Sequence, residues 1–268
     1  MAEQHAPPPK LDPNIPHTAR VWNYWLGGKD NYAADRAVGD QIRQVIPDIV
    51  DSARADRLFL GRAVRYLAGE AGIRQFLDLG TGLPTADNTH EVAQAIAPES
   101  RIVYVDNDPL VLTHARALLV GSPEGRTDYI HADVREPEAV IEAAKATLDF
   151  SRPVAIMMLG ILNFVTDDDQ ADAVVRRFLD AVPSGSHLAI AHPTAEVNGD
   201  AAREAVRIGN EAGVAQMCLR DRERLTRFFD GLELLPPGVV SCSLWRPSES
   251  PFGVPDEVYQ FCGVGRKV

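Results

Sequence analysis

The chain has 268 residues, of which 45% are hydrophobic, and a formal net charge of −11. This length and apolar content can bury one large core, which excludes the disordered and fibrous classes. The negative charge disfavours nucleic acid and membrane surfaces as partners, because both bind clustered Lys and Arg. The sequence has no apolar run of membrane-span length and no signal-peptide pattern, so we expect a cytoplasmic protein.

The first 70 residues divide into a tail and a helical segment. Residues 1–16 hold five prolines and few apolar side chains, which predicts a flexible Pro-rich tail. Residues 17–70 predict an N-terminal helical cap, with breaks at Gly27-Gly28 and before Pro47.

Aromatic and polar side chains of this cap have different expected roles. Trp22 and Trp25 are expected to pack the cap onto the sheet, whatever their polar neighbours do. Asn31 and Tyr32 follow the glycine break and are predicted to line a substrate pocket under the cap.

Residues 75–82 are the most informative segment of the chain. An apolar run ends in Asp78, Gly80, Thr81 and Gly82, which is typical of a buried strand that feeds a tight glycine turn and then a helix. Glycine is needed there because a side chain would block a cofactor from the backbone, and because such a turn requires positive φ. The segment therefore predicts a site for a nucleotide-like cofactor.

The same turn departs from the dinucleotide fingerprint at its third position. A G-x-G-x-x-G motif that starts at Gly80 would require glycine at position 85, where the sequence has Thr85. The phosphate-binding G-x-x-x-x-G-K-[ST] loop is also missing from the sequence. A cofactor with a ribose and no pyrophosphate therefore fits better than NAD, FAD or a nucleoside triphosphate.

A second predicted strand, residues 101–106, ends in Asp106, which is 24 residues after Gly82 (106 minus 82). A carboxylate at such a position can accept hydrogen bonds from both hydroxyls of a ribose. The alternative is that Asp106 is a turn or cap residue. That alternative ranks second, because Asp108-Pro109 already supplies the N-cap and first residue of the next helix.

Two further strands extend the pattern. Residues 128–133 end in Asp133, whose carboxylate is predicted to accept from an adenine amino group. Residues 153–165 form a continuous apolar run that breaks at Gly160, as is typical of a central parallel strand. Strands with polar or glycine residues at their carboxyl ends predict a ligand crevice, and Asn163, just beyond the break, is predicted to contact substrate.

The last third of the chain predicts one more parallel strand and an antiparallel ending. Residues 186–192 form the strand, and His192 at its end is a candidate base by position, with a hydrogen-bonded framework histidine as the alternative. Residues 194–231 predict a polar helical insertion, and residues 238–245 and 257–264 predict an antiparallel pair. Neither the cysteines nor the histidines show metal-ligand spacing, so no metal site is predicted.

Together these motifs resemble the class I S-adenosylmethionine-dependent methyltransferases over residues 50–268. The resemblance implies an α/β Rossmann-like fold, with a mostly parallel seven-stranded sheet, helices on both faces and an antiparallel last strand. It implies a core over residues 71–268. The residues that it assigns to the cofactor are Asp78, Gly80, Thr81, Gly82, Asp106, Asn107, Asp133, Val134, Leu159 and Gly160.

Two narrower resemblances concern the N-terminal part of the chain. Residues 16–32 are similar to a bacterial S-adenosyl methyltransferase family formerly labelled a domain of unknown function. The segment before the glycine turn is similar to leucine carboxyl methyltransferase-like enzymes, in which an upstream arginine meets the cofactor carboxylate. Arg57 is the candidate here, Arg54 and Arg62 are the alternatives, and solvated helix arginines are equally consistent with the sequence.

The resemblance implies transfer of a methyl group from S-adenosylmethionine to an acceptor that we expect to be a small molecule. No motif for DNA amino-methylation is present, and no general base is identifiable. One alternative is a non-catalytic module that binds S-adenosylmethionine or S-adenosylhomocysteine. A less favoured alternative is an NAD-dependent oxidoreductase. The sequence does not predict the oligomeric state.

Overall fold

The structure is a computed structural model that describes residues 12–84, 87–108, 111, 121–248 and 253–268. The expectations for tail residues 1–11, for Thr85 and for Pro109 lie outside the described residues. The helices within these ranges are α1 (Thr18–Trp25), α2 (Ala33–Val45), α3 (Ile49–Gly69), α4 (Thr89–Ile96), α6 (Pro137–Ala144), α7 (Asp168–Asp180), α8 (Gly199–Glu211) and α9 (Arg222–Arg227), with a 3-10 turn η1 (Leu162–Phe164).

The strands within the same ranges form one eight-stranded sheet, one strand more than expected, because the two-residue β7 is added beside β8. They are β1 (Gln75–Leu79), β2 (Arg101–Asp106), β3 (Arg126–His131), β4 (Ala155–Leu159), β5 (His187–Pro193), β6 (Leu232–Leu234), β7 (Val240–Ser241) and β8 (Gln260–Lys267). The order along the sheet is β3-β2-β1-β4-β5-β8-β6, and β7 pairs with β8. Strands β1 to β5 are parallel and β8 is antiparallel to β5, which confirms the expected mostly parallel sheet with an antiparallel last strand.

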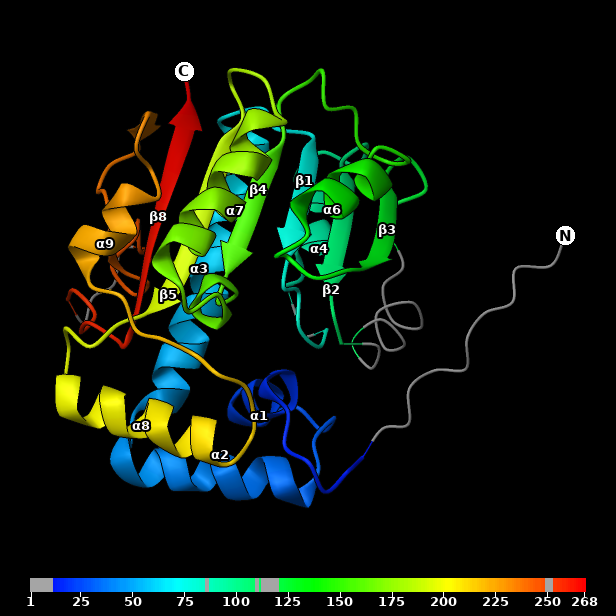
Figure 1. The fold of residues 1–268 in the computed structure, drawn as a ribbon. Helices are drawn as coiled ribbons and strands as arrows, with labels where there is room; N and C mark the ends of the chain where they lie inside the picture. The colour runs from blue at the N-terminus through cyan, green and yellow to red at the C-terminus, as the bar shows by residue number, and fades with distance from the viewer. Residues whose placement is uncertain (1–11, 85–86, 109–110, 112–120, 249–252) are drawn as a thin grey trace, which may run out of the picture.

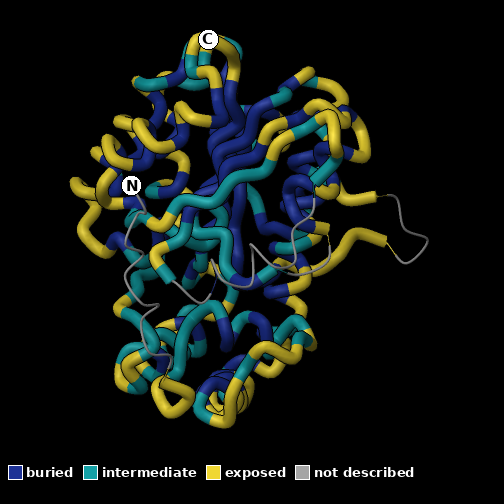
Figure 2. Tube along the Cα trace, turned by 90° about the vertical axis from the view of Figure 1, so that its right-hand side faces the viewer, coloured by how far each residue is buried: buried dark blue, intermediate teal, exposed yellow. Residues whose placement is uncertain are grey.

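The sheet carries an apolar core on each face. Leu77 and Leu79 of β1 face one core, which α6, α7 and α9 cover, whereas Phe76 faces the other, which α3 and α4 cover. Figure 1 shows α6 and α7 in front of the sheet and α3 and α4 behind it. The central strands are buried through most of their length, whereas the edge strands β3 and β6 are not (Figure 2). The result is the helix–sheet–helix arrangement that a parallel sheet requires.

Helices α1, α2 and α8 form a layer that faces the carboxyl ends of the parallel strands (Figure 1). Val38 and Ile42 of α2 pack with Ala202 of α8 in a small core of their own. Helix α3 joins this layer to the sheet, because Ile49 belongs to the small core and Phe59 to the core between α3 and the sheet. None of the helices in the described ranges is long and apolar enough to cross a membrane.

Two predictions for the last third of the chain are wrong in detail. The stretch 194–231 is not continuously helical, because α8 stops before Gly213, whose φ is +75°, and α9 begins only at Arg222. The expected pair 238–245 and 257–264 is reduced to the two residues of β7, because the chain then turns to bury Trp245 against α3. The short strand β6 pairs with β8 at the edge instead.

Candidate functional site

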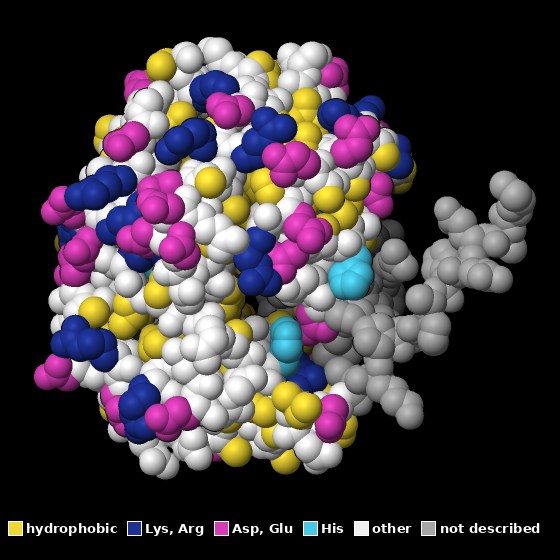
Figure 3. All heavy atoms as spheres, in the orientation of Figure 1, with side chains coloured by type: hydrophobic (Ala, Val, Ile, Leu, Met, Phe, Trp, Pro, Cys, Tyr) yellow, Lys and Arg dark blue, Asp and Glu magenta, His cyan; other side chains and the backbone are white. Residues whose placement is uncertain are grey.

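A cavity of about 510 Å³ lies where the carboxyl ends of the parallel strands face the helical layer. The ends of β1, β2 and β4 form one wall, and side chains of α1, α2, α3 and α8 form the other. Figure 3 shows the surface hollowed between the sheet and this layer. Ligands of open α/β sheets bind at this edge, and a volume of roughly 300–1,000 Å³ suits a small-molecule site.

The glycine turn after β1 meets two different demands. The backbone N–H of Gly80 donates to Val105 O at 2.8 Å, which ties the end of β1 to β2. Gly80 has φ +77°, and a Cβ built on it would lie 2.7 Å from the Ile161 side chain. Gly82 has φ +66°, and nothing lies within 4 Å of its built Cβ. Packing therefore requires glycine at position 80, whereas Gly82 leaves open space beside the cavity.

Asp106, at the end of β2, lies against this turn with its carboxylate on the cavity wall. Its Oδ2 accepts from the backbone N–H of Gly82, and its Oδ1 accepts from that of Asp108, both at 2.9 Å. Burial raises its pKa, and these two backbone bonds oppose that rise. Asp106 thus also has the turn role that the sequence offered as the alternative to ribose binding. Since a carboxylate has about four acceptor sites, the two backbone bonds leave others for a ligand.

His17 brings the first helix to the same place. Its Nδ1 lies 3.1 Å from Asp108 Oδ2, and its side chain caps the start of α1. The N-terminus of α1 is thereby attached to the end of β2, next to Asp106.

Asp78 and Arg57 lie on the α3 and α4 side of the turn, and both line the cavity. Asp78 Oδ2 accepts from Thr89 Oγ1 at 2.6 Å, and burial raises the pKa of Asp78 to about 6 although this bond lowers it. Arg57 Nη2 donates to Asn88 Oδ1 at 2.9 Å.

The two alternative arginines of α3 lie elsewhere. Arg54 is exposed and pairs with Asp51, and Arg62 donates to the backbone oxygens of Cys242 and Trp245. Only Arg57 of the three predicted candidates lines the cavity.

Asp133, after β3, is held by a neighbouring arginine. Arg135 donates to both carboxylate oxygens, at 2.8 and 2.5 Å, and its bonds lower the pKa of Asp133 to about 2. Asn107 Nδ2 donates to Asp133 at 3.3 Å, which joins the ends of β2 and β3. The predicted contact with an adenine amino group therefore depends on the remaining acceptor sites of this carboxylate. Val134 is buried and also lines the cavity.

Beyond the end of β4 the cavity continues into a space that apolar side chains enclose. We call it the apolar chamber, and the residues that define it are Trp22, Trp25, Val38, Ile42, Val206 and Met217. These come from α1, α2, α8 and the irregular segment after α8. Sequence reasoning missed the contribution of α8 and this segment, because their contacts with α2 connect parts of the chain that are far apart.

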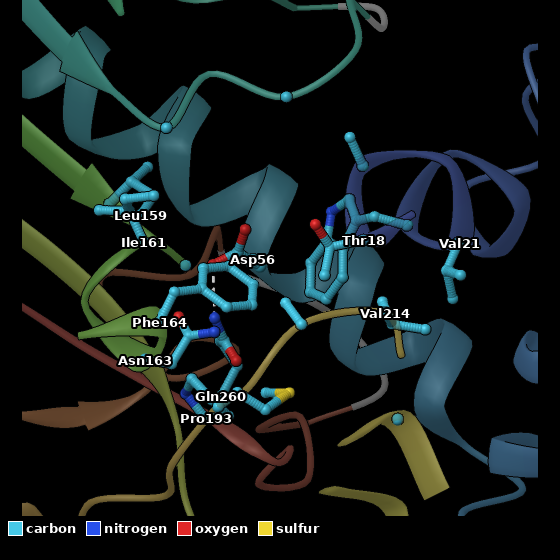
Figure 4. Close-up of a pocket in the computed structure, with 18 of the residues that line it drawn as sticks. Thr18, Val21, Asp56, Leu159, Ile161, Asn163, Phe164, Pro193, Val214 and Gln260 are labelled. Atoms are coloured by element: carbon cyan, nitrogen blue, oxygen red, sulfur yellow. Dashed lines mark hydrogen bonds between the residues drawn. The ribbon is translucent and has the colours of Figure 1, made fainter. Parts of the chain in front are cut away.

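Polar side chains lie where the apolar chamber meets the sheet. Asp56 of α3 is 8% exposed, and its Oδ1 accepts from Gln260 Nε2 at 3.4 Å (Figure 4). Asn163, which lines the cavity as predicted, is 3% exposed, and its Oδ1 has no hydrogen-bond partner among the described residues. Asp56 was missed in the sequence, although its spacing of four from Ser52 and Leu60 places an acid on the buried face of a helix.

The carboxylate of Asp106 and the open space beside Gly82 fit a ribose-containing cofactor that passes over the glycine turn. A family model described as S-adenosyl methyltransferase matches residues 4–268. The chain belongs to the S-adenosyl methyltransferase family. Its methyl donor is S-adenosylmethionine, and its activity is S-adenosylmethionine-dependent methyl transfer.

Solved structures agree with this membership. A DUF574 family protein from Streptomyces avermitilis is 44% identical, over 97% of this chain and 100% of its own, with a TM-score of 0.92. A protein described as a candidate methyltransferase from Thermobifida fusca is 45% identical, over 97% of this chain and 98% of its own, with a TM-score of 0.88.

A more distant neighbour shows the fold alone. This S-adenosylmethionine-dependent methyltransferase from Anabaena variabilis is 12% identical, over 77% of this chain and 83% of its own, with a TM-score of 0.52. A search among curated proteins found no match.

Substituting each glycine of the methyltransferase's turn should separate packing from ligand contact. Gly80→Ala and Gly82→Ala both introduce positive-φ strain of about 1–3 kcal/mol, but only the Gly80→Ala methyl would collide with Ile161. We expect Gly80→Ala to have the lower melting temperature in thermal unfolding. For Gly82→Ala, the larger effect should instead be a loss of affinity for S-adenosylhomocysteine. Equal melting temperatures would contradict the packing role of Gly80.

Two of the predicted substrate residues of the methyltransferase do not line the cavity. Asn31 donates from Nδ2 to Asn23 Oδ1 and Gly28 O, both at 3.0 Å, so it stabilises the turn between α1 and α2. Tyr32 is 36% exposed at the start of α2, with its ring under the guanidinium of Arg20. The prediction for both residues is wrong, because the polar groups after the glycine break are used to hold the cap together.

The prediction for His192 as a candidate base is also wrong, because a buried arginine occupies one of its ring nitrogens. Its Nε2 accepts from Arg220 at 2.9 Å, and its Nδ1 donates to Pro193 O at 2.8 Å. Burial, assisted by the Arg220 charge, lowers the pKa of His192 to about 3, so the imidazole stays neutral. The framework alternative is therefore confirmed.

Arg220 also fixes the loop that carries Asn163. It is 3% exposed and donates to the carbonyl oxygens of Leu162 at 2.9 Å and Val165 at 2.7 Å. Its Nε binds Asp168 at 2.8 Å, at the start of α7. The two carbonyl bonds lie on either side of Asn163, so Arg220 positions this side chain at the cavity.

Proposed function

We propose that this methyltransferase acts on a small molecule whose body is largely apolar. The observation that carries the proposal is the apolar chamber, which joins the cofactor side of the cavity at the end of β4. A helical layer over the strand ends admits a small molecule more readily than a folded protein or a duplex. Figure 3 also shows basic side chains interspersed with acidic ones on this face, unlike the basic track of a nucleic-acid site.

The proposal assigns the cofactor to the strand ends. Asp106 would hold the ribose hydroxyls, and the turn from Gly80 to Gly82 would lie against the cofactor. The adenine would lie near Asn107, Asp133 and Val134, and the methionine part would extend past Asp78 toward Leu159 and Gly160. When bound, S-adenosylmethionine supplies a methyl group that is already activated as a sulfonium. The chain therefore needs chiefly to orient the acceptor and exclude water, and orientation can contribute about 7–11 kcal/mol.

We also propose that Arg57 binds the carboxylate of the cofactor, and a pair of ligands tests this. Arg57→Gln should weaken S-adenosylhomocysteine at least about tenfold, because a charge-assisted bond is lost. Methylthioadenosine has no amino-acid carboxylate, so its affinity should not change. Arg54→Gln, on the exposed side of the same helix, is the matched control. Equal losses for both ligands would assign Arg57 to the turn instead of to the carboxylate.

Acceptor size can be tested with S-adenosylmethionine that carries a labelled methyl group. The protein is incubated with a bacterial extract that dialysis has divided into small molecules and macromolecules. We expect enzyme-dependent label in organic-soluble products of the dialysable fraction. Label only in the retained fraction would contradict a small acceptor. Cofactor binding with no transfer to either fraction would favour the non-catalytic module.

A further inference from the structure

Asp56 places one formal charge beside the apolar chamber. The other acidic and basic side chains that line the cavity within the described residues lie on its cofactor side: His17, Arg57, Asp78, Asp106, Asp133 and Arg135. Asp56 instead lies on the face of α3 that meets β8 and the end of β4. Figure 4 shows it between Leu159 and Ile161 on one side and Thr18 and Val214 on the other.

The Asp56 carboxylate has few donors around it. Its Oδ1 accepts from Gln260 Nε2 at 3.4 Å and lies 4.0 Å from Cys242 Sγ. Among the described residues, none donates a hydrogen bond to its Oδ2, and no cationic side chain forms an ion pair with the carboxylate. A buried carboxylate without a paired cation is unfavourable, so the site is suited to a ligand that brings one.

A second buried acceptor lies close by. The side-chain oxygen of Asn163 has no partner among the described residues, and Figure 4 shows Asn163 beside Gln260 and below Asp56. Two acceptors that face one space need a ligand with several donors. A hydroxyl has one donor, whereas an ammonium group has two or three and also carries the positive charge.

The site is also next to the end of β4. A Cβ built on Gly160 would lie 3.8 Å from Gln260 Nε2, the atom that donates to Asp56. A nitrogen held by Asp56 is therefore near the point where the cofactor side meets the apolar chamber.

We propose that the acceptor is an apolar amine whose protonated nitrogen binds to Asp56 and Asn163 while its body fills the apolar chamber. This inference rests on the proposed function and specifies its substrate class. An anionic acceptor is disfavoured by the same carboxylate.

Asp56 would then also accept a proton. The ammonium nitrogen gives one proton to the Asp56 carboxylate and so regains its lone pair. The nitrogen forms a bond to the methyl carbon as the carbon–sulfur bond breaks, and that electron pair remains on sulfur. The proton on Asp56 passes to solvent when the products leave. Burial raises the pKa of Asp56 to about 6, opposed by Arg57 and by the bond from Gln260, which makes it a better proton acceptor than an exposed aspartate.

The test measures binding to the protein saturated with S-adenosylhomocysteine, so that it does not depend on turnover. The probes are three matched sets: phenethylamine and tryptamine, the alcohols phenethyl alcohol and tryptophol, and the carboxylates hydrocinnamate and indolepropionate. We expect each amine to bind at least about tenfold more tightly than the matched alcohol, and the carboxylates to bind most weakly.

Two aspartates on α3 provide the variant and its control. Asp56→Asn keeps the shape of the side chain and should abolish the preference for amines over alcohols. Asp51→Asn, at an exposed position, should leave it unchanged. Thermal unfolding at pH 8 should show Asp56→Asn to be no less stable than wild type, because the substitution removes a buried charge.

The outcomes separate the two proposals. Failure of the wild-type protein to bind S-adenosylhomocysteine would contradict the cofactor assignment itself. If S-adenosylhomocysteine binds normally, any of three results would overturn the amine proposal alone. These are that no amine binds, that alcohols or acids bind as tightly as amines, or that Asp56→Asn keeps the preference for amines.

Discussion

Asp106→Ala should weaken S-adenosylhomocysteine binding by about 100-fold, or about 3 kcal/mol, while the protein remains folded. The carboxylate accepts from the backbone N–H groups of Gly82 and Asp108 and still faces the cavity. Two charge-assisted bonds to ribose hydroxyls would account for a loss of this size. Calorimetric titration measures the affinity, and thermal unfolding checks the fold.

Two controls locate the effect of Asp106 on the ribose. Asp106→Asn keeps one acceptor oxygen and should fall between wild type and Asp106→Ala. Methylthioadenosine contains the same ribose, so its affinity should fall by the same factor in Asp106→Ala. In Arg57→Gln, by contrast, its affinity should not change. Unchanged affinity in a folded Asp106→Ala protein would remove the ribose assignment and leave Asp106 as a turn residue.

Arg220→Met should be the most destabilising of these substitutions, by about 3–5 kcal/mol. The guanidinium is buried, and its bonds to Leu162 O, Val165 O and His192 Nε2 would leave three buried acceptors without donors. For a chain of this size, that loss lowers the melting temperature by on the order of 10 °C. Thermal unfolding at neutral pH measures the shift.

Arg222→Met is the matched control for Arg220→Met. Arg222 forms two ion pairs, with Glu196 and Glu257, but its side chain is 44% exposed. Pairs of this kind contribute about 0–1 kcal/mol, so its melting temperature should change little. Equal shifts for the two variants would contradict the role of Arg220 as the buried support of the Asn163 loop.

The strands of the cofactor side could be predicted from the sequence because each is signalled locally. The run before Asp78 and Gly80 marks a strand and its turn, and the acid at Asp106 marks the end of the next one. Parallel pairing then brings their carboxyl ends to one edge. The edge strand β6 lacks such a signal, since three residues are too few to show alternation.

The acceptor side was less predictable because distant segments build it. Residues of α1, α2, α8 and the segment after α8 together line the apolar chamber. No local sequence pattern predicts that these segments contact one another. Asn163 was predicted from its place after β4, and it lines the cavity. Tyr32 and His192 have equally suggestive positions, but one caps a helix and the other accepts from Arg220. Position along the chain does not reveal which polar groups are already paired.

The most direct test of the central claim is a calorimetric titration of the ligand-free protein with S-adenosylmethionine, S-adenosylhomocysteine and NAD in parallel. The claim is that the cavity at the strand ends binds S-adenosylmethionine across the turn from Gly80 to Gly82. Micromolar binding of the first two ligands, with no heat from NAD, is the predicted result. Binding of NAD alone, or of none of the three, would contradict it.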